Sequence, residues 1–406
     1  MRVAVLGAGL QGACVAMELA SRGTNVDLFE KKAQCLTQAS ARNEGKIHLG
    51  FVYANDRTLQ TARTMLKGAL AFSPLLRRWI GNEIDQIPIS EPFYYVVHRD
   101  SLLSREEVER HLHATHAIAV EQDSNAVGEY FGADYRVAPE RLSESECESL
   151  FDRRAVLAAY RTPEIGIDAE VLAAIVSRRL SSDFHIHCRL QTNVQRVEPD
   201  SHGISLEFES ATGRSRERYD HVVNTLWDGR LLIDQTAGLQ PERPWLFRVK
   251  YHLRIRLAAS APVFPTTTIV LGPFGDVVTY SNHEMYLSWY PVGMRGSSKK
   301  LMPPDWPLEL DGKDANEMRT AIIAGLRSVV PSLSLLTPEH VEACEVKAGI
   351  IFAWGETDID DRASGLHARY AIGPRTVGRY HSIDTGKLTM APLFGRTVAD
   401  RIQQIG

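Results

Sequence analysis

The first thirty residues alternate between apolar runs and a helical pattern. Residues 2–6 (RVAVL) are almost wholly apolar, which is typical of a strand buried on both faces of a parallel sheet. Residues 10–22 carry apolar side chains at helical spacing, and Gly23 stands where a glycine commonly ends a helix. Residues 25–30 (NVDLFE) again favour a strand. The pattern predicts a β-α-β unit at the start of the chain.

The rest of the chain mixes amphipathic and alternating stretches. Helical spacing predicts helices over 59–80, 105–118, 140–150, 167–180 and 314–330, and a last one within 387–405. Alternation predicts a strand over 93–98 and strand-rich stretches over 185–227 and 246–292. Residues 296–313 hold Gly, Ser, Pro and Lys, which favours a loop.

This order of elements predicts the fold class. An α/β beginning and end around a strand-rich middle indicates an α/β protein, α+β overall, with a Rossmann-like domain that is discontinuous in sequence. We expect residues 1–80, 151–245 and 350–406 to form that nucleotide-binding domain. Residues 81–150 and 246–349 are expected to form an inserted, mainly antiparallel β-sheet domain that binds the substrate.

The composition limits the classes of binding partner that we expect. The 406 residues hold 46 Lys and Arg against 50 Asp and Glu, so a net charge of -4 favours neither nucleic acid nor an anionic membrane as partner. Every apolar run is shorter than the ~18 residues that a membrane span needs. Five scattered cysteines without a C-x-x-C pair indicate a reduced, cytoplasmic protein without disulfides.

A glycine fingerprint follows the first predicted strand. Residues 7–12 (GAGLQG) match G-x-G-x-x-G between a strand and a helix, as dinucleotide binding requires. Gly7 permits the tight turn, Gly9 lets the main chain approach a pyrophosphate, and Gly12 lets the helix pack close to the strand. The helix N-terminus then offers free N–H groups to the phosphates.

Glu30 ends the second predicted strand and is the expected ribose ligand. A carboxylate there accepts hydrogen bonds from ribose hydroxyls and repels a 2′-phosphate, which argues against NADP. The fingerprint alone does not separate FAD from NAD. The sequence shows no second copy of it, which suggests that the organic substrate itself reduces a flavin. The expected contacts in this half are Gly7, Gly9, Leu10, Gln11, Gly12, Glu30 and Lys31.

Residues 39–53 (ASARNEGKIHLGFVY), together with the fingerprint, resemble the D-amino-acid-oxidase-like superfamily of FAD-dependent oxidoreductases. The similarity is greatest to the branch that holds glycerol-3-phosphate dehydrogenase and L-2-hydroxyglutarate oxidase. In that branch a Ser-x-Arg/Asn loop and an Ile/Val-His-x-Gly segment run along the pyrophosphate to the isoalloxazine ring. The resemblance implies FAD contacts from Ser40, Arg42, Asn43, Gly45, Lys46 and Ile47, and it places His48 near the ring.

Further segments resemble the same family in the same order. Residues 162–176 are similar to its Asp-led helix, 192–198 to the strand that contacts adenine through Val194, and 220–230 to a phosphate-side turn that includes Thr225. Leu226 and Trp227 depart from the small residues usual in that turn. Residues 380–400 resemble the Gly-Lys-Leu-Thr segment at the N1–C2=O edge of the flavin. The resemblance therefore implies contacts from Gly386, Lys387, Leu388 and Thr389. A solvated surface lysine is the alternative for Lys387.

Hydride transfer to a flavin needs a base for the O–H or N–H proton of the substrate. His48 is the expected base, and a structural role in its loop is the alternative. His381 and Arg379 are further catalytic candidates, although His381 also suits a hydrogen bond within its turn. Arg254 could hold a substrate carboxylate, and its alternating strand leaves its direction open. Tyr251 and Tyr280 are candidate substrate ligands, with core packing as the alternative. The histidines lack acidic or thiol partners at ligand spacing, so we expect no metal site.

The sequence thus predicts an FAD-dependent oxidoreductase, a dehydrogenase or an oxidase. It would oxidise a CH–OH or CH–NH group of a small, carboxylated substrate by hydride transfer to flavin N5, with oxygen or another electron acceptor. An NAD-linked dehydrogenase and a non-catalytic dinucleotide-binding protein are the alternatives. The sequence leaves covalent flavin attachment through His48 or Cys35 open, together with the oligomeric state.

Overall fold

The computed structural model describes residues 1–122, 130–272 and 275–405. Within them, no helix combines the length and the apolar character that crossing a membrane requires. The helices are α1 (Leu10–Ser21), α2 (Gln60–Ile80), α3 (Arg105–Val120), α4 (Glu144–Leu150), α5 (Ala169–Ser182), α6 (Arg230–Thr236), α7 (Tyr290–Gly293), α8 (Gly312–Arg327) and α9 (Ala391–Ile405).

The strands form three sheets. The first holds β1 (Arg2–Leu6), β2 (Asn25–Phe29), β6 (Ile186–Arg189), β10 (His221–Asn224), β18 (Gly373–Val377) and β19 (Tyr380–Asp384). The second holds β3 (Tyr94–His98), β4 (Glu140–Arg141), β5 (Val156–Arg161), β11 (Trp245–Leu257), β12 (Thr267–Val270), β13 (Gly275–Thr279), β14 (Glu284–Trp289), β15 (Met294–Ser298), β16 (Glu309–Leu310) and β17 (Val341–Trp354). The third holds β7 (Asn193–Asp200), β8 (Gly203–Ser210) and β9 (Gly213–Tyr219).

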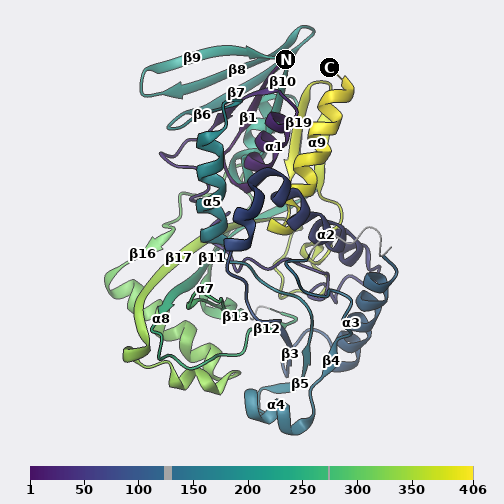
Figure 1. The fold of residues 1–406 in the computed structure, drawn as a ribbon, viewed down its shortest axis with the longest axis vertical. Helices are drawn as coiled ribbons and strands as arrows, with labels where there is room; N and C mark the ends of the chain where they lie inside the picture. The colour runs from purple at the N-terminus through teal and green to yellow at the C-terminus, as the bar shows by residue number, and fades with distance from the viewer. Residues whose placement is uncertain (123–129, 273–274, 406) are drawn as a thin grey trace.

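The six-stranded sheet contains the β-α-β unit that the sequence predicts. Its order is β18-β19-β10-β1-β2-β6, with parallel pairing from β19 to β6 and β18 as an antiparallel edge. In Figure 1 this part lies at the top, with both chain ends and with α1 beside α9. Because the strands run parallel, Gly7 after β1 and Glu30 after β2 emerge at the same edge.

Alternation along β1 explains why both faces of this sheet are covered. Val3 and Val5 pack into a core with α1, α2, α5 and α9. Ala4 and Leu6 point to the other face, where the three-stranded sheet packs on them through Val197 and other side chains. Side chains of successive residues on a strand point to opposite faces, so an unbroken apolar run needs a layer on each side.

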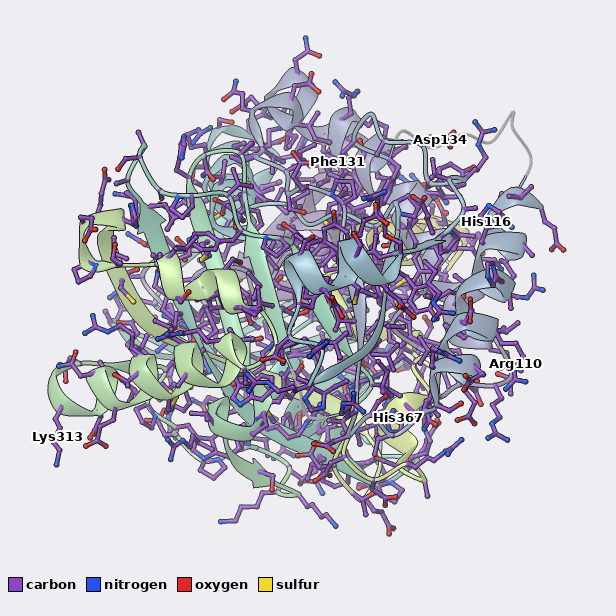
Figure 2. All side chains as sticks on the ribbon, turned by 90° about the horizontal axis from the view of Figure 1, so that it is seen from below. Arg110, His116, Phe131, Asp134, Lys313 and His367 are labelled. Carbon is purple, nitrogen blue, oxygen red and sulfur yellow. The ribbon has the colours of Figure 1, made fainter. Side chains whose placement is uncertain are left out.

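The ten-stranded sheet forms the lower part of the molecule in Figure 1. Its order is β16-β17-β11-β14-β13-β12-β3-β5-β4, with β15 also paired to β11, and its pairs are antiparallel except β12 with β3. Helix α8 packs on it through Met318, Ile322 and Leu326. Seen from below, Lys313 on α8 and Arg110 on α3 lie at opposite margins of this part (Figure 2).

The predicted fold class is confirmed, and two details differ. β5 lies within the stretch 151–245 but pairs with β3 in the ten-stranded sheet, and β17 runs through the expected boundary at 350. The apolar run of β5 suits either sheet, so its sequence does not assign it. The stretch 296–313, expected as a loop, contributes two short edge strands at its ends, β15 and β16. The division into two domains with the predicted ranges stays a proposal.

Candidate active site

The fingerprint turn brings bare main chain to the edge of the six-stranded sheet. Gly7 has φ +93°, a conformation that other residues rarely adopt, and a Cβ on Gly12 would stand 1.9 Å from the Gly7 carbonyl oxygen. Ala8 N donates to the Glu30 carboxylate at 3.0 Å, and Leu10 N donates to Ser40 Oγ at 2.8 Å. These contacts fix the shape of the turn.

A cavity of about 1030 Å³ starts at this turn. Residues predicted to hold the adenosine half line it: Gly7, Gly9, Glu30, Lys31, Ser40, Val194 and Thr225. Trp227, at the family's small-residue position, also lines it with φ +53° and donates its indole N–H to Ile350 O at 2.8 Å. The departure from the family pattern therefore forms a wall of the site.

A second cavity of about 1020 Å³ continues from the first and shares Gly9, Ser40, Thr225 and Trp227 with it. The fingerprint and the tail meet here, although they lie at opposite ends of the chain. Gln11 Nε2 donates to Ala391 O at 3.1 Å, and Thr385 Oγ1 donates to Gln11 Oε1 at the same distance. The predicted residues that line this cavity are Gly9, Leu10, Gln11, Ser40, Arg42, Asn43, Lys46, His48, Thr225, Gly386, Lys387 and Leu388.

The remaining predicted cofactor residues support this cavity from behind. Gly45 packs so tightly that a Cβ would stand 1.8 Å from Ile167 O, and Gly12 packs on Gly7 and Thr225. Ile47 is fully buried, and its N–H donates to Ile165 O at 3.0 Å. Thr389 Oγ1 accepts from His48 N at 3.0 Å. An elongated site with a glycine cradle at one end and a polar tail turn at the other fits FAD.

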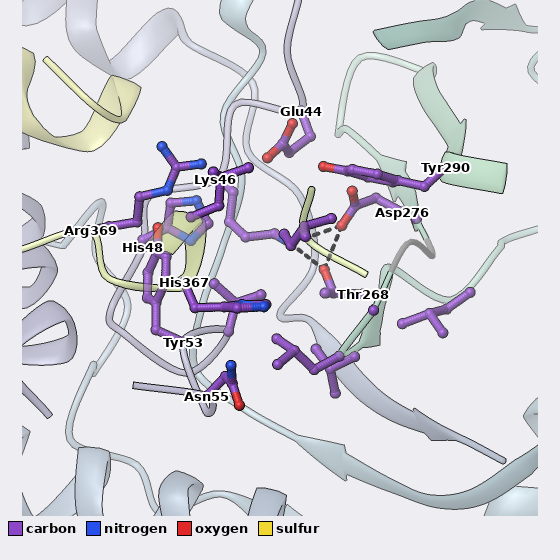
Figure 3. A pocket seen from close by; sticks show the side chains of 18 of the residues that line it. Glu44, Lys46, His48, Tyr53, Asn55, Thr268, Asp276, Tyr290, His367 and Arg369 are labelled. Carbon is purple, nitrogen blue, oxygen red and sulfur yellow. Dashed lines mark hydrogen bonds and ion pairs between the residues drawn. The ribbon is translucent and has the colours of Figure 1, made fainter. Parts of the chain in front are cut away.

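A third cavity of about 720 Å³ opens from the second and shares Glu44, Lys46, His48, Tyr290 and Lys387 with it. Figure 3 shows its two sides. Arg369, His48 and Tyr53 gather on one side, and Thr268, Asp276 and Tyr290 stand on the other. The Tyr53 hydroxyl is buried and has no hydrogen-bond partner within the described residues. This cavity adjoins the tail turn, where the flavin ring is expected, and is the candidate substrate site.

Cations are concentrated around the second and third cavities, and three of them are paired with carboxylates. Arg42 Nη2 lies 2.6 Å from Glu309 Oε1. Lys46 Nζ lies 2.9 Å from Asp276 Oδ1, also bonds Thr268, and stands 4.3 Å over the Phe93 ring. The predicted cofactor lysine thus directs its ammonium group to the substrate side. Lys250 Nζ lies 3.7 Å from Glu44 Oε2. Within the described residues, Lys387 and Arg369 form no ion pair with a carboxylate.

Both unpaired cations have pKa values lowered by their surroundings. Burial lowers the pKa of Lys387 to about 8; Glu44 opposes this effect, and Arg369, Lys250 and Lys46 add to it. Burial lowers the pKa of Arg369 to about 10, and Arg248 adds to that effect. Desolvated cations without a partner are stabilised by a bound anion. The surface lysine considered as an alternative for Lys387 is therefore wrong, since Lys387 is half-buried in the cavity wall.

His48 stands between the second and third cavities and faces a buried carboxylate. Its Nδ1 lies 3.6 Å from Glu164 Oε1, and Glu164 is fully buried. Burial lowers the pKa of His48, Glu164 opposes that effect, and Lys387 and Lys46 strengthen it. Burial alone would raise the pKa of Glu164, but His48, Lys46 and the Tyr95 hydroxyl together hold it below its usual value. His48 is therefore neutral, and Glu164 charged, at neutral pH.

Two predicted catalytic residues lie at the amino ends of the parallel strands of the six-stranded sheet, whereas the cavities lie at the carboxyl ends. Arg379 is exposed in the turn just before β19, and His381 is the second residue of that strand. The His381 ring is buried against His221, at 3.1 Å between ring nitrogens, and against Thr376. Because β19 runs parallel to β1, residues at its start lie away from Gly7 and the cavities. The prediction of a catalytic role for these two residues is contradicted by this placement.

The predicted substrate residues have other partners. Arg254 Nη2 lies 2.6 Å from Asp168, and its Nε lies 2.9 Å from Glu284, in a surface depression beside α5. Tyr251 donates its hydroxyl to Pro307 O at 2.6 Å. Tyr251 lies on the face of β11 opposite to Lys250, which lines the second cavity. Arg254 shares the face of Lys250 but lies further along the strand, beside α5, and lines neither the second nor the third cavity, which corrects the predicted role of both residues. Tyr280 donates to Glu44 O at 2.9 Å and so supports the loop of the site without lining it.

Three site residues were not predicted from the sequence. Arg369 and Tyr53 line the third cavity, and Glu164 stands behind His48. Glu164 offered one signal, since it is an acidic residue in the family-like segment 162–176. Tyr53 is the last residue of the family-like segment 39–53, whereas Arg369 lies in a segment without a motif, and only the folded chain brings the two together.

The comparisons with known proteins agree with this geometry. A family model described as FAD dependent oxidoreductase matches residues 2–401. The chain belongs to this family, so it is an FAD-dependent oxidoreductase, and FAD is its cofactor. The predicted membership in the D-amino-acid-oxidase-like superfamily is confirmed, and the NAD-linked and non-catalytic alternatives fall away. No curated protein sequence matches the chain.

Solved structures share the fold along nearly the whole chain. A glycine oxidase from Geobacillus kaustophilus has a TM-score of 0.68 and 17% identity, covering 100% of this chain and 95% of its own. An L-proline dehydrogenase from P. horikoshii has 0.65 and 15%, covering 99% and 93%. An L-alpha-glycerophosphate oxidase from Mycoplasma pneumoniae, solved with FAD bound, has 0.63 and 13%, covering 99% and 94%. At these identities the likeness is one of fold.

Proposed function

We propose that this enzyme oxidises a CH–OH or CH–NH group of a small substrate that carries a carboxylate, and that Arg369 binds the carboxylate. The observation that carries the proposal is the state of Arg369. Its guanidinium is buried beside the third cavity, donates to Phe352 O at 3.2 Å, and has no acidic partner within the described residues. A planar fork of donors in a desolvated wall matches a carboxylate better than any other common small anion except phosphate.

The surroundings of Arg369 support the size and charge of this substrate. The cavity of about 720 Å³ has room for a small organic molecule. The buried Tyr53 hydroxyl next to Arg369 is free for a further hydrogen bond to the same group. Lys46 at the far side is paired with Asp276, so it does not offer the substrate a free charge.

The cofactor and the chain divide the chemistry. When bound, FAD supplies the acceptor for the two electrons that leave the substrate carbon. His48 takes the proton of the hydroxyl or amino group, since it is neutral at neutral pH and borders both cavities. Gly386, Lys387 and Leu388 would hold the polar edge of the ring, and Lys387 favours negative charge there. Oxygen or another acceptor then reoxidises the cofactor.

The names of the similar enzymes include substrates with an amine and substrates with a hydroxyl group. Glycine and L-proline carry an amine, and glycerophosphate carries a hydroxyl, in the proteins so named. All five cysteines of this chain are free thiols, which supports the proposed cytoplasmic location.

Anaerobic reduction tests the proposal. The purified yellow protein is mixed without oxygen with 2-hydroxy acids, amino acids, N-methyl amino acids and their amide or ester derivatives, and flavin absorbance is followed. We expect bleaching by at least one carboxylated compound and roughly a hundredfold weaker response to its amide. Equal bleaching by the amide, or bleaching by uncharged alcohols and amines alone, would overturn the proposal.

A further inference from the structure

Glu164 is a buried carboxylate beside the His48 ring, with its Oε1 3.6 Å from Nδ1. It lies between β5 and α5, far in sequence from the loop that carries His48, and its side chain is fully buried. Its Oε2 accepts from Leu49 N at 2.6 Å, and its Oε1 accepts from the Tyr95 hydroxyl. A fully buried charge is destabilising unless it has partners, and Glu164 Oε1 also faces the His48 ring.

The surrounding main chain fixes both residues relative to each other. Ile47 N donates to Ile165 O at 3.0 Å, and the Tyr130 hydroxyl bridges Ile47 O at 2.7 Å and Ile165 N at 3.0 Å. Thr389 Oγ1 accepts from His48 N and donates to Lys46 O at 3.2 Å. The main chains of the two short segments are therefore held together by several hydrogen bonds, which place the His48 and Glu164 side chains next to each other.

The ring edges of His48 have different surroundings. Nδ1 is completely buried and lies 3.6 Å from Glu164 Oε1, outside hydrogen-bond distance in this structure. Nε2, on the far edge of the ring, is then the nitrogen left for a group in the cavities. The other titratable or charged groups around the ring are Tyr53, with ring centroids 5.4 Å apart, Lys46, Lys387 and Glu44.

We propose that Glu164 is a positioning residue for His48: its carboxylate keeps the hydrogen of the neutral ring on Nδ1, so that Nε2 can accept the substrate proton, and it then stabilises the imidazolium. The inference rests on the proposed function, in which His48 is the base. Only a proton moves in this step, from the substrate hydroxyl or amino group to Nε2. Two lysines raise the cost of a positive charge on His48, and one buried carboxylate offsets that cost.

A titration of His48 tests this role without any substrate. The flavin-loaded protein is labelled with ¹⁵N-histidine, and the His48 ring signals are assigned by their loss in His48→Asn. In Glu164→Gln we expect the midpoint of His48 protonation to fall by roughly 1 to 3 pH units, because the opposing charge is gone. Glu91→Gln makes the same change on an exposed side chain just before β3, and it should leave the midpoint of His48 protonation unchanged. Equal midpoints in Glu164→Gln and the wild type would overturn the proposal.

Activity gives the second readout once a substrate is found. The kcat/KM of Glu164→Gln should fall about tenfold or more on its plateau, and its acidic limb should move to lower pH by the shift that the titration gives. A loss of rate with an unmoved acidic limb would overturn the role. If Glu164→Gln does not fold, Glu164→Asp keeps the charge and withdraws it from the ring, so a smaller shift of the same sign is expected. Failure of every carboxylated compound to bleach the flavin would overturn the proposed function, and the titration would still decide on Glu164.

Discussion

The α-carbon of Gly12 packs directly on the carbonyl group of Gly7. A Cβ at Gly12 would lie 1.9 Å from that oxygen and 2.7 Å from Thr225 Oγ1. The first turn of α1 therefore presses against the end of β1, and its residues Leu10 and Gln11 line the second cavity.

Gly12→Ala should separate α1 from β1 and empty the site. We expect a loss of roughly 1 to 3 kcal/mol in the free energy of unfolding, as for overpacking in a core, and a protein with little bound flavin. Denaturant unfolding and the ratio of flavin to protein absorbance measure both effects. Gly229→Ala is the matched control, since Gly229 lines the adenosine-side cavity but its Cβ would meet nothing nearer than 3.6 Å. Equal flavin content in the two variants would contradict the packing argument.

Lys387→Met should make the bound flavin harder to reduce. A lysine with a pKa of about 8 is mostly charged at pH 7, and its loss should lower the midpoint potential by roughly 30 mV. Because the wild-type lysine loses its charge as pH rises through about 8, the gap between the two proteins should narrow above that pH. Potentials measured against reference dyes test this, with the exposed Lys67→Met as control. A constant gap from pH 6 to pH 10 would contradict the assignment.

Arg369→Met should weaken substrate binding and leave the cofactor in place. Loss of a bidentate charged contact should raise KM about a hundredfold for the carboxylated substrate, with an unchanged flavin content. Arg369→Lys should recover only part of the affinity, because an ammonium group lacks the planar fork. Steady-state kinetics measure the effect, and the exposed Arg396→Met serves as control. An unchanged KM would remove Arg369 from the site.

Asp56→Asn should destabilise the start of α2 in a pH-dependent way. Asp56 accepts from Thr61 N at 2.9 Å and from Thr58 N at 3.0 Å, and these bonds lower its pKa below 3.8 although burial alone would raise it. A lowered carboxyl pKa stabilises the fold above the unfolded value, and that contribution disappears as pH falls through the folded value. We expect a cost of about 1 kcal/mol at pH 7 that shrinks below pH 4. Urea unfolding across that range tests the trend, and a gap that widens in acid would contradict it.

The part of the site that is built from short continuous segments could be predicted from the sequence. Gly7, Gly12 and Glu30 act through positions fixed by one β-α-β unit, so their roles follow from spacing alone. The loop at 39–53 and the tail turn were placed by resemblance, and the structure brings both to one cavity. The residues of each of these parts lie close together in sequence, so a motif is enough to identify them.

The rest of the site depends on which strands become neighbours. Arg379 precedes β19 and His381 is its second residue. Their closeness in sequence to Gly386 suggested a shared site, but the rest of the strand carries Gly386 to the opposite end of the sheet. Arg254 lies on a strand whose facing direction depends on its partners. The proposed roles of Arg369 and Glu164 depend on their position near His48, which lies in a distant segment, so the sequence does not reveal them.

The meeting of Gln11 with Thr385 and Ala391 has a consequence for biosynthesis. The ribosome releases the glycine turn long before the tail that completes the wall of the flavin-side cavity. A nascent chain that ends before residue 385 would contain the glycine turn but lack the tail residues that contact Gln11. We therefore expect FAD to bind only after the last residues have been synthesised. Early chain termination should therefore yield colourless protein even when most of the fold has been made.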